Sequence, residues 1–553
     1  MFGCALVAAC SSSGPSASST GSGGATATGG ATAVGSGANG GLAQGGTSST
    51  ANGGAPAGGS GANGGASTMG ASGGAPANGG ANGNGGTVAG STGGATGTRP
   101  DGGALGTGCG AGDPKLPSEP SLPAACTTLT ANKASANDAL APADETSADT
   151  SSIQAALDAC PSGQAVRLTT SGNNDAFLSG PLSLDGKTLW VDTGVTLFAS
   201  RNPRDYDTSA GACGVAGTSN GCEPFIAATG KGAGIVGDGV IDGRGGEPML
   251  GGTKTWWDVS NSTTGSYSNP RLVQVTNAQD FTLYRITLHD SPNFHVVIGS
   301  QGFVVWGVTV VTPWKTVNSA GTALTPVYAR NTDGIDPAGA SNGYVVCSKI
   351  SDGDDQIAIK GGTATSHLVV AHDRFGAGHG MSIGSETNGG VSDIDVYDLS
   401  IDGTFSGMGG GSSNGIRIKS DASRGGLVSN VTYEDVCTRG LANPIILSPH
   451  YSTATGSLIP DFQGITIRDF HATGTVRPTV TIDGYDAARA TDLTLDNVVV
   501  DGIDSGTVTA SYANVTLGPG DVNFTPSGSN VTVNRQIAGT STPNPCTDKW
   551  TTF

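Results

Sequence analysis

The sequence has little charge, and its first part has none. Only 13% of the 553 residues are Asp, Glu, Lys or Arg, and residues 1–98 contain none of these four types. That stretch consists mainly of Gly, Ala, Ser, Thr and Asn, so it has too few apolar side chains to offset the entropy of ordering the chain. We therefore expect residues 11–108 to be a disordered Gly/Ser/Ala-rich tether and residues 109–553 to be the folded domain.

Basic residues are scarce relative to acidic ones. The chain has 26 Lys and Arg against 44 Asp and Glu, which gives a formal net charge of −18 and an isoelectric point near 4.6. A field of this sign repels phosphate backbones, so we expect no nucleic-acid partner. Any anionic ligand would need a local cluster of Lys and Arg side chains.

Long apolar runs and metal-binding motifs are absent as well. No stretch approaches the roughly 18 continuous apolar residues that suggest a membrane-spanning helix. No CxxC pair or His-rich tract indicates a structural zinc site. We therefore expect no spanning helix, and neither a metal nor another cofactor.

A short apolar run, "MFGCALVAAC", stands at the N-terminus and is followed by small polar residues. It resembles a bacterial lipobox, in which Cys10 would become the lipidated first residue of the mature protein. The positive residues that usually precede an export signal are missing, so we expect residues 1–10 to be a truncated lipoprotein signal. This expectation places the protein outside the cell or on its surface, with a lipid anchor at Cys10.

Cysteines are few, but their number is informative. Setting aside Cys4 and Cys10, eight of the ten remain, and an even number in an exported chain indicates disulfides. Cys213 and Cys222 close a short Gly-rich loop and are the first predicted pair, and Cys126 with Cys160 is the second. The pairing of the other four stays open: Cys109, Cys347, Cys437 and Cys546.

The local patterns indicate one helix followed by many strands. Residues 149–160, "DTSSIQAALDAC", offer Ser and Thr as N-caps and an apolar stripe at Ile153, Ala156 and Leu157. After them, short runs rich in Val, Ile and Thr are separated by Gly, Asn and Asp, which is typical of an all-β fold. These runs recur roughly every 20 to 30 residues, a period that indicates a solenoid.

Two all-β architectures compete. A sandwich or barrel would join its strands by hairpins with tight turns such as Asn-Gly. Here one or two polar or Gly residues separate consecutive strands, as in "VSDIDVYDLSIDG". This spacing favours a right-handed parallel β-helix, with the helix at 149–160 capping one end. Such a core grows in length and not in thickness, so it accommodates residues 109–553 in a single domain.

Carboxylates gather in one part of this poorly charged chain. Asp333 lies in "NTDGIDPAG", and Asp354 and Asp355 lie in "SDGDDQIAIKGG". Asp333 and Asp354 are 21 residues apart, and Asp355 and His379 are 24 apart, so each interval is about one coil. Stacked coils lie roughly 4.8 Å apart, and we therefore expect these four side chains to converge on one face.

Later coils add cations and an aromatic residue to that face. The alternation in "NGIRIKSD" puts Arg417 and Lys419 on one side of a strand and the isoleucines on the other, and Tyr451 follows in "LSPHY". Crowded carboxylates raise one another's pKa, which is what general acid catalysis requires near neutral pH. One protonated Asp beside two ionised ones suits hydrolysis of a glycosidic bond.

Four motifs occur in a diagnostic order: "NTDGID" at 331, "GDDQIAIK" at 353, "GHGMSIGS" at 378 and "RIK" at 417. With "GVIDGRG" at 239 and "SPNFH" at 291, they make residues 120–500 similar to the polygalacturonases, the pectin hydrolases of glycoside hydrolase family 28. The resemblance implies a monomeric enzyme that hydrolyses the α-1,4-galacturonosidic bonds of polygalacturonate (homogalacturonan, the pectin backbone) with inversion.

The same resemblance implies a role for each site residue. Asp354 would be the general acid, Asp333 and Asp355 would activate water, and His379 would tune the protonation of the acid. Arg417 and Lys419 would bind a galacturonate carboxylate, with Tyr451 at the same subsite. Two positions depart from the family pattern: Gln356 replaces a Cys common in relatives, and Tyr451 lies outside the usual "DQxY" context.

Alternative functions remain open at this point. A pectate lyase would share the fold but would need a calcium-binding acidic site. A rhamnogalacturonan or other pectin-backbone hydrolase would need fewer galacturonate-binding cations. A non-catalytic polysaccharide-binding β-helix would leave the four motifs without a purpose.

Other residues near the cluster have competing interpretations. Asp336 and Asp352 are interpreted as turn residues that bond to their own backbone, and Glu386 as a rim residue. Lys360 is either a subsite residue or a solvated turn charge. Trp256 and Trp257 form a sugar platform or pack in a wall. The remaining histidines are interpreted as ordinary surface or core residues: His289, His295, His367, His372, His450 and His471.

Overall fold

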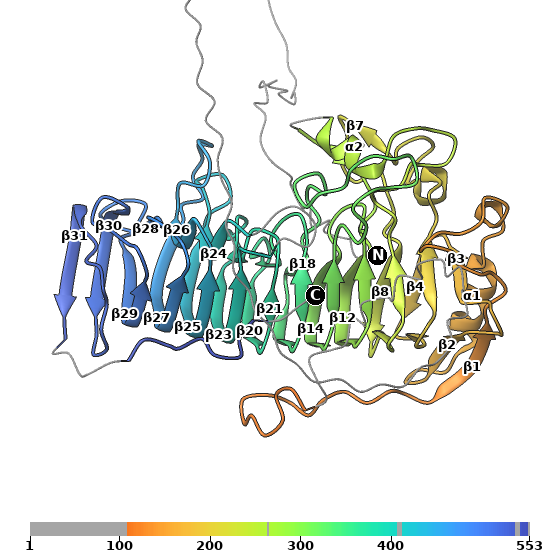
Figure 1. Ribbon diagram of the computed structural model, residues 1–553, viewed down its shortest axis with the longest axis horizontal. Helices are drawn as coiled ribbons and strands as arrows, with labels where there is room; N and C mark the ends of the chain where they lie inside the picture. The colour runs from red at the N-terminus through yellow and green to blue at the C-terminus, as the bar shows by residue number, and fades with distance from the viewer. Residues whose placement is uncertain (1–107, 263–264, 406–411, 537–541, 551–553) are drawn as a thin grey trace, which may run out of the picture. The chain divides into compact units, whose positions relative to one another are not determined.

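The computed structural model describes residues 108–262, 265–405, 412–536 and 542–550. Nearly all strands in these ranges pair in parallel and form a right-handed β-helix, which confirms the predicted fold (Figure 1). None of the helices in these ranges has the length and apolar composition of a membrane span. The predicted signal at 1–10, its Cys10 anchor and the tether up to residue 107 lie outside the described residues, so they stay predictions.

Three faces run along the stack. The first, called here the site face, contains β4 (Leu182–Asp185), β8 (Ile226–Lys231), the first parts of β12 (Val273–Tyr284) and β14 (Val296–Trp306), β16 (Ile335–Pro337), β19 (Ile357–Ile359), β22 (Met381–Ile383), β24 (Asn414–Lys419), β26 (Asn443–Ser448), β28 (Val480–Asp483) and the first part of β30 (Val508–Leu517).

The second face carries the longer strands. It contains β1 (Ala125–Thr130), β2 (Ala165–Thr169), β5 (Thr188–Val191), β9 (Gly234–Val236), the later parts of β12 and β14, β17 (Ser341–Val346), β20 (Thr365–Ala371), β23 (Val391–Asp402), β25 (Leu427–Arg439), β27 (Asp461–Thr473), β29 (Thr491–Val500) and β31 (Gly528–Arg535).

The third face leads back into the site face of the same coil. It contains β3 (Ala176–Ser179), β6 (Thr196–Ala199), β10 (Val240–Asp242), β13 (Thr287–His289), β15 (Thr309–Val311), β18 (Lys349–Ser351), β21 (Arg374–Phe375) and the later parts of β23, β25 and β27.

Alternation within the short strands fixes which side chains face the interior. In β24, Ile416 and Ile418 are each 1% exposed and lie in the core, whereas Arg417 projects from the outer surface. One inward ladder runs through Ile335, Ile357, Met381, Ile416 and Ile445, which pair in register from coil to coil. Burying each such side chain stabilises the fold by about 1.5–3 kcal/mol. The inward ladder therefore also aligns the outward side chains of the same strands.

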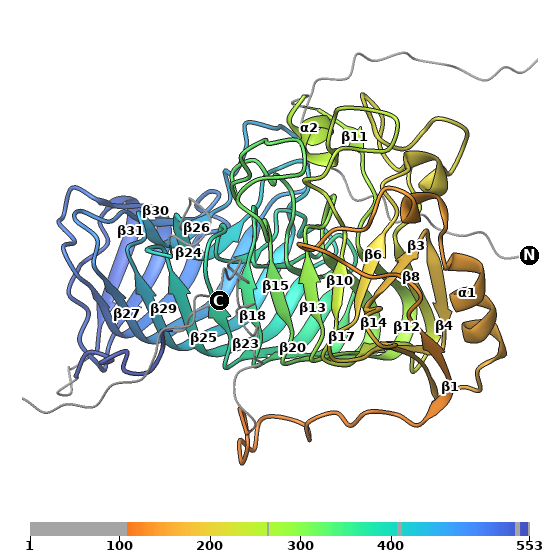
Figure 2. The ribbon, with the colours of Figure 1, turned by 45° about the vertical axis from the view of Figure 1, so that its right-hand side comes forward.

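Helix α1 (Thr150–Ala159) covers the first coils at one end of the stack (Figure 2). Ile153 and Leu157 are buried, as the predicted apolar stripe requires. The predicted Ser or Thr cap is wrong, because the N-cap is Asp149 and its side chain makes no capping hydrogen bond. Its carboxylate instead pairs with Lys133 Nζ at 2.8 Å and accepts the Leu178 N–H, which ties the helix to the sheet.

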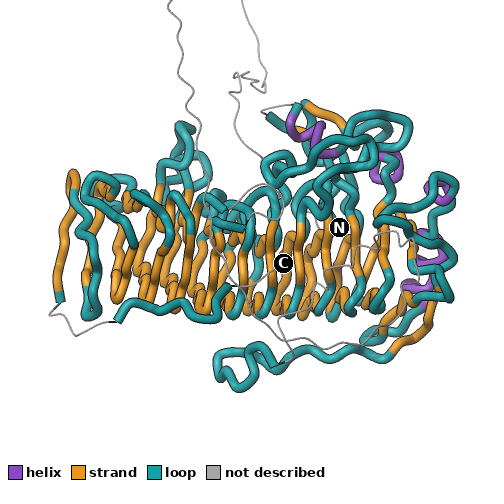
Figure 3. The backbone as a smooth tube through the Cα atoms, viewed as in Figure 1, coloured by secondary structure: helices purple, strands orange, loops and turns teal. Residues whose placement is uncertain are grey.

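The remaining helices lie in loops, and the long loops gather on one side of the stack (Figure 3). They are the 3-10 turns η1 (Asp144–Thr146) and η2 (Pro203–Tyr206) and helix α2 (Trp256–Asn261), beside the small antiparallel pair β7 (Val215–Ala216) and β11 (Tyr267–Ser268). Trp256 and Trp257 on α2 are fully buried, so the wall-packing interpretation is right and the sugar-platform alternative is wrong.

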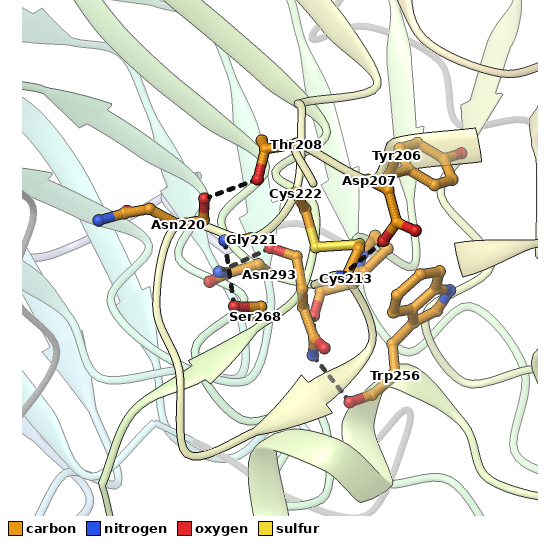
Figure 4. Close-up of a disulfide and its surroundings, with 12 residues drawn as sticks. Tyr206, Asp207, Thr208, Cys213, Asn220, Gly221, Cys222, Trp256, Ser268 and Asn293 are labelled. Carbon is orange, nitrogen blue, oxygen red and sulfur yellow. Dashed lines mark hydrogen bonds between the residues drawn. A yellow bond between two sulfur atoms is a disulfide. The ribbon is translucent and has the colours of Figure 1, made fainter. Parts of the chain in front are cut away.

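The first predicted disulfide holds this loop region together (Figure 4). Cys213 and Cys222 are bonded, and the Cys213 N–H donates to Asp207 Oδ1 at 2.8 Å. Tyr206 meets the ring of Trp256 edge-on, with the centroids 5.9 Å apart. The second predicted pair, Cys126–Cys160, is also present.

Two further disulfides, which the sequence left open, fasten the chain ends to the stack. Cys109 is bonded to Cys347, and Cys437 to Cys546. They join residues separated by 238 and 109 positions. Ion pairs add to them, because Lys549 Nζ lies 2.6 Å from Asp435 Oδ2.

Candidate active site

The structure brings the predicted site residues together on the site face. Asp333 precedes β16, Asp354 and Asp355 precede β19, and His379 precedes β22. Because Ile335, Ile357 and Met381 are aligned in register, the turns that precede these strands stack on one another. The two later coils supply the rest of the predicted set: Arg417 and Lys419 in β24, and Tyr451 just after β26.

These turns border a cavity of about 320 Å³. Its lining includes five of the predicted residues: Asp333, Asp354, Asp355, Lys419 and Tyr451. The other lining residues are Phe294, Asn331, Lys360, Ser385, Glu386, Asp421, Arg424 and Ser452. A cleft with convergent carboxylates and cations suits a sugar acid better than a neutral sugar.

Asp355 is held as a carboxylate by two cations. Lys419 Nζ lies 2.7 Å from its Oδ2, and Arg417 Nη2 and Ser382 Oγ both donate to its Oδ1. Burial alone would raise the pKa of Asp355, but the charges of Arg417 and Lys419 outweigh it and hold the pKa well below its usual range. Asp355 is therefore ionised at any pH at which the protein would work.

Asp354 shares a proton with His379. His379 Nδ1 lies 3.0 Å from Asp354 Oδ1, and Asn331 Nδ2 donates to Oδ2 at 3.1 Å. Burial opposes the charge of Asp354, but the hydrogen bond and charge of His379 lower its pKa below the ordinary value. The same pairing raises the pKa of His379 despite its burial. Both shifts favour the charged pair, an Asp354 carboxylate beside a His379 imidazolium, over the neutral pair.

Asp333 has the opposite environment. Its side chain is 4% exposed, and in the described part of the chain it contacts one cation, Lys360, whose Nζ lies 3.3 Å from Oδ2. Burial first, and then the charges of Asp336 and Asp354, raise the pKa of Asp333 well above its ordinary value. The prediction that crowding raises a carboxyl pKa in this cluster thus holds for Asp333 in this structure and not for Asp354.

Lys360 joins two carboxyls and is no solvated turn charge, so that alternative is wrong. It is 18% exposed, and its Nζ lies 3.3 Å from both Asp333 Oδ2 and Asp336 Oδ2. Asp336 sits in the middle of β16 with its side chain fully buried, so its interpretation as a turn residue is also wrong. Asp352 does behave as a turn residue, since its Oδ1 accepts the Asp354 N–H at 3.0 Å.

Three contributors escaped the sequence interpretation. Asn331 is oriented by Tyr267, whose hydroxyl donates to Asn331 Oδ1 at 3.0 Å, and Ser382 supports Asp355 from the next coil. Arg424 enters the cavity from the turn after β24. Asn331 opens the "NTD" motif and could have been found there, whereas no local signal marks Ser382 or Arg424.

Tyr451 and His295 occupy different parts of the site. The ring of Tyr451 is half exposed, and Lys419 Nζ lies 5.0 Å from its centroid. His295 is fully buried, and its Nδ1 lies 3.1 Å from the Thr332 carbonyl oxygen. Burial lowers the pKa of His295 to about 4, so the ring is neutral and supports the backbone next to Asp333. Its interpretation as a satisfied core histidine is confirmed.

Ligand atoms of Asp354, Asp355 and His379 lie within 4.8 Å of one another, which is close enough to hold an ion. Arg417 and Lys419 already neutralise Asp355, and His379 is engaged with Asp354. A divalent cation here would face two buried positive charges within contact distance of its ligand. The donor set therefore favours proton transfer over metal binding.

Comparisons with known proteins agree with this geometry. The sequence profile described as "Glycosyl hydrolases family 28" matches residues 160–522. The chain is 47% identical over 426 residues to a polygalacturonase of Ralstonia nicotianae, and the alignment covers 69% of this chain and 80% of the relative. It is 39% identical over 398 residues to an endo-polygalacturonase of Pectobacterium carotovorum subsp. carotovorum, and that alignment covers 70% of this chain and 90% of the relative.

A solved structure gives the same result. The polygalacturonase from Erwinia carotovora ssp. carotovora superposes with a TM-score of 0.63 at 36% identity. The superposition covers 76% of this chain and 99% of that one. All seven predicted site residues lie inside the range matched by the family profile.

Proposed function

Because the chain belongs to family 28 of the glycosyl hydrolases, we propose that it hydrolyses the α-1,4-galacturonosidic bonds of homogalacturonan, the polygalacturonate backbone of pectin. The observation that carries this proposal is the cavity itself. It places three cations, Lys360, Lys419 and Arg424, among four aspartates and Glu386 in a protein whose overall charge is strongly negative. Such a local concentration of cations is what an anionic polysaccharide requires to approach this surface.

In the proposed mechanism Asp354 protonates the leaving glycosidic oxygen. The proton comes from the pair that Asp354 forms with His379, 3.0 Å away. A bound sugar that displaces water from this pair disfavours its two separated charges, and transfer of the proton from imidazolium to carboxylate removes them. His379 thus serves as the reservoir of the catalytic proton.

Asp333 and Asp355 activate the attacking water from the other side of the bond. Asp355 is ionised by its two cations, and Lys360 supplies the charge that favours the ionised form of Asp333. Inverting glycosidases leave room for a water between acid and base, with carboxyls roughly 6.5–9.5 Å apart. We propose inversion because the chain belongs to family 28, whose resemblance implies it.

Arg417, Lys419 and Tyr451 bind the substrate. Both cations contact Asp355, and Lys419 also lies against the half-exposed ring of Tyr451. A galacturonate carboxylate that binds there exchanges water for charge-assisted hydrogen bonds. The stacked face of Tyr451 covers the sugar ring.

The remaining proposals concern the domain organisation of the chain and its location. We propose that residues 109–553 form the catalytic domain, that 11–108 are a tether, and that Cys10 carries a lipid anchor outside the cell or on its surface. A chain that begins at Gly108 and so keeps the Cys109–Cys347 disulfide should retain activity on soluble pectin, and Cys10→Ser should release the protein from the membrane fraction. We propose that the enzyme acts as a monomer.

The deciding experiment is digestion of polygalacturonate by the purified protein. We expect new reducing ends without the ultraviolet absorbance of an unsaturated uronate, and an anomeric configuration inverted in the first-formed product. A ladder of oligomers would indicate internal cleavage, as the name of the Pectobacterium relative suggests. Unsaturated products would instead identify a lyase, and binding without cleavage would identify a polysaccharide-binding module.

A further inference from the structure

The cavity has two walls, and the second one has no assigned role. The catalytic aspartates stand in turns that precede the short strands of the site face. The opposite wall consists of turns that follow those strands, and Ser385, Glu386, Arg424 and Ser452 line the cavity from there. A strand of three residues spans roughly 10 Å, so a sugar can lie between the two walls.

Arg424 is the only guanidinium among the lining residues of this cavity in the described part of the chain. It is 18% exposed, and Nη1 donates to Glu386 Oε1 at 3.1 Å and to Ser385 Oγ at 3.3 Å. Nε lies 3.5 Å from Asp421 Oδ2. Two carboxylates thus fix the orientation of the guanidinium plane.

The second terminal nitrogen of Arg424 remains open. Among the described residues Nη2 has no hydrogen-bond partner, and it is not a buried unsatisfied atom. The other two cations of the cavity also contact carboxylates. Lys360 contacts Asp333 and Asp336, and Lys419 contacts the buried Asp355.

Polygalacturonate carries a carboxylate on every sugar unit. A chain in this cavity therefore brings more than one carboxylate, and the cations near Asp355 account for one of them. An arginine held in place with a free N–H edge is the best suited side chain for another, since its donors match carboxylate geometry.

We propose that Arg424 forms a second carboxylate-binding subsite, which selects a non-esterified galacturonate unit of the bound chain, with Glu386 as its orienting partner. This inference rests on the proposed function. Glu386 keeps the guanidinium in place and adds a negative charge that weakens carboxylate binding. The subsite therefore discriminates against methyl-esterified units without binding free ones so tightly that release slows.

The test compares three variants by their KM and kcat on de-esterified polygalacturonate. Arg424→Gln should raise KM by about tenfold or more, the usual effect of losing a hydrogen bond between charged groups, with kcat nearly unchanged. Glu386→Gln keeps an acceptor oxygen for Arg424 but removes the repulsion, so KM should fall. Arg439→Gln is the matched control: it removes the same charge from an arginine that pairs with Asp402 and does not line the cavity.

A second measurement separates recognition from a structural role. On pectins of increasing methyl esterification the wild-type KM should rise steadily, and Arg424→Gln should flatten that rise because its subsite no longer distinguishes the two groups. Arg424→Lys should recover part of the wild-type slope, since it restores the charge but not the fork.

The outcomes distinguish this inference from the proposed function. Wild-type protein that releases no reducing ends from polygalacturonate overturns both. Active wild type with an Arg424→Gln KM equal to that of Arg439→Gln overturns the subsite alone. A Glu386→Gln variant whose KM rises as much as that of Arg424→Gln also overturns the subsite. The Arg424–Glu386 pair would then only stabilise the wall of the cavity.

Discussion

The carboxyls on the two sides of Asp354 are equally buried but carry opposite pKa shifts. On the N-terminal side, Asp333 and Asp336 share contacts with Lys360 while Arg271 acts on both from farther away, and the pKa of each is raised, that of Asp336 to about 6. On the C-terminal side, Asp355 alone has two cations, and its pKa is lowered. Burial raises the pKa of all three carboxyls, and the cations in contact with Asp355 outweigh it there.

This difference gives the site a gradient of proton affinity across neighbouring coils. The side that holds protons tightly lies toward Asp333, and the permanently ionised side lies at Asp355. Asp354 stands between them with its proton on His379. A transferable proton next to a fixed charge is the arrangement that acid–base chemistry requires.

We expect the largest effect from replacing Asp354, the residue between the two sides. Asp354→Asn cannot deliver a proton, so we expect turnover to fall by about 10² to 10⁴-fold, the usual contribution of a general acid. KM should change little, because the amide keeps the shape of the carboxyl. Initial rates on polygalacturonate provide the measurement, and a variant that kept more than about a tenth of the wild-type turnover would refute the role of Asp354.

The second prediction removes the carboxyl on the cation-rich side. Asp355→Asn leaves Arg417 and Lys419 buried without their partner, so the free energy of unfolding should fall by about 3–5 kcal/mol, and turnover should be lost as well. Chemical denaturation measures the first effect.

Asp352→Asn is the control for that prediction. Asp352 is buried as deeply but its pKa is raised by burial, and its amide replacement can still accept the Asp354 N–H. At pH 4, below its raised pKa, its unfolding free energy should change by less than about 1 kcal/mol. Equal losses in both variants would show that cation pairing does not separate the two sides.

The third prediction concerns Lys360, the cation that contacts Asp333 and Asp336. Lys360→Met removes the one positive charge that contacts Asp333 among the described residues, so the pKa of Asp333 should rise further and the acidic limb of the pH–rate profile should move to higher pH. Below that limb we expect turnover to fall by about tenfold, the factor that accompanies a change of 1.4 kcal/mol. A limb that did not move would mean that Asp333 is not the base that titrates there.

The smallest effect tests the burial rule away from the site. Asp373 is fully buried, and burial raises its pKa well above the ordinary value, although its Oδ1 accepts the Ser348 N–H at 2.6 Å. A raised pKa in the folded state contributes stability below the unfolded value of about 3.9, and this contribution is lost as pH rises through the folded pKa.

Asp373→Asn cannot titrate, so it should not lose this contribution to stability as the pH rises. Between pH 4 and pH 8 its unfolding free energy should gain about 1–2 kcal/mol relative to wild type, as follows from proton linkage, with activity unchanged. Denaturant titrations at both pH values provide the measurement. A gain that appeared at low pH instead would contradict the direction of the shift.

Much of the fold and most of the site residues could be predicted from sequence. The recurring strand pattern predicts the β-helix, and the intervals between Asp333, Asp354 and His379 predict that their turns stack. Alternation in "IRIK" correctly separates Arg417 from its flanking isoleucines. The two short disulfides follow from spacing, whereas Cys109–Cys347 could not be predicted because the chain between its cysteines makes many coils.

The misjudged residues share a physical cause. Asp336 occupies an outward position in a three-residue strand and is nevertheless fully buried. The local sequence pattern therefore led to its interpretation as a turn residue. Trp256 and Trp257 are covered by loop residues from other coils, and Leu324 and Tyr328 pack around Trp257. The loops that cover these side chains have unequal lengths, and no period in the sequence marks where they fold back.

The sequence by itself therefore determined the parts of this protein that depend on a repeat. Strand pairing forces each coil to lie at a fixed distance from the next, so counting residues along the chain is enough to place Asp333, Asp354 and His379 together. Only the tertiary structure decided which cation meets which carboxyl, and hence which side chain holds a proton. Those contacts, such as Lys360 with Asp336 and Arg424 with Glu386, depend on how turns of different length approach one another, and electrostatic energies change steeply over a few ångströms.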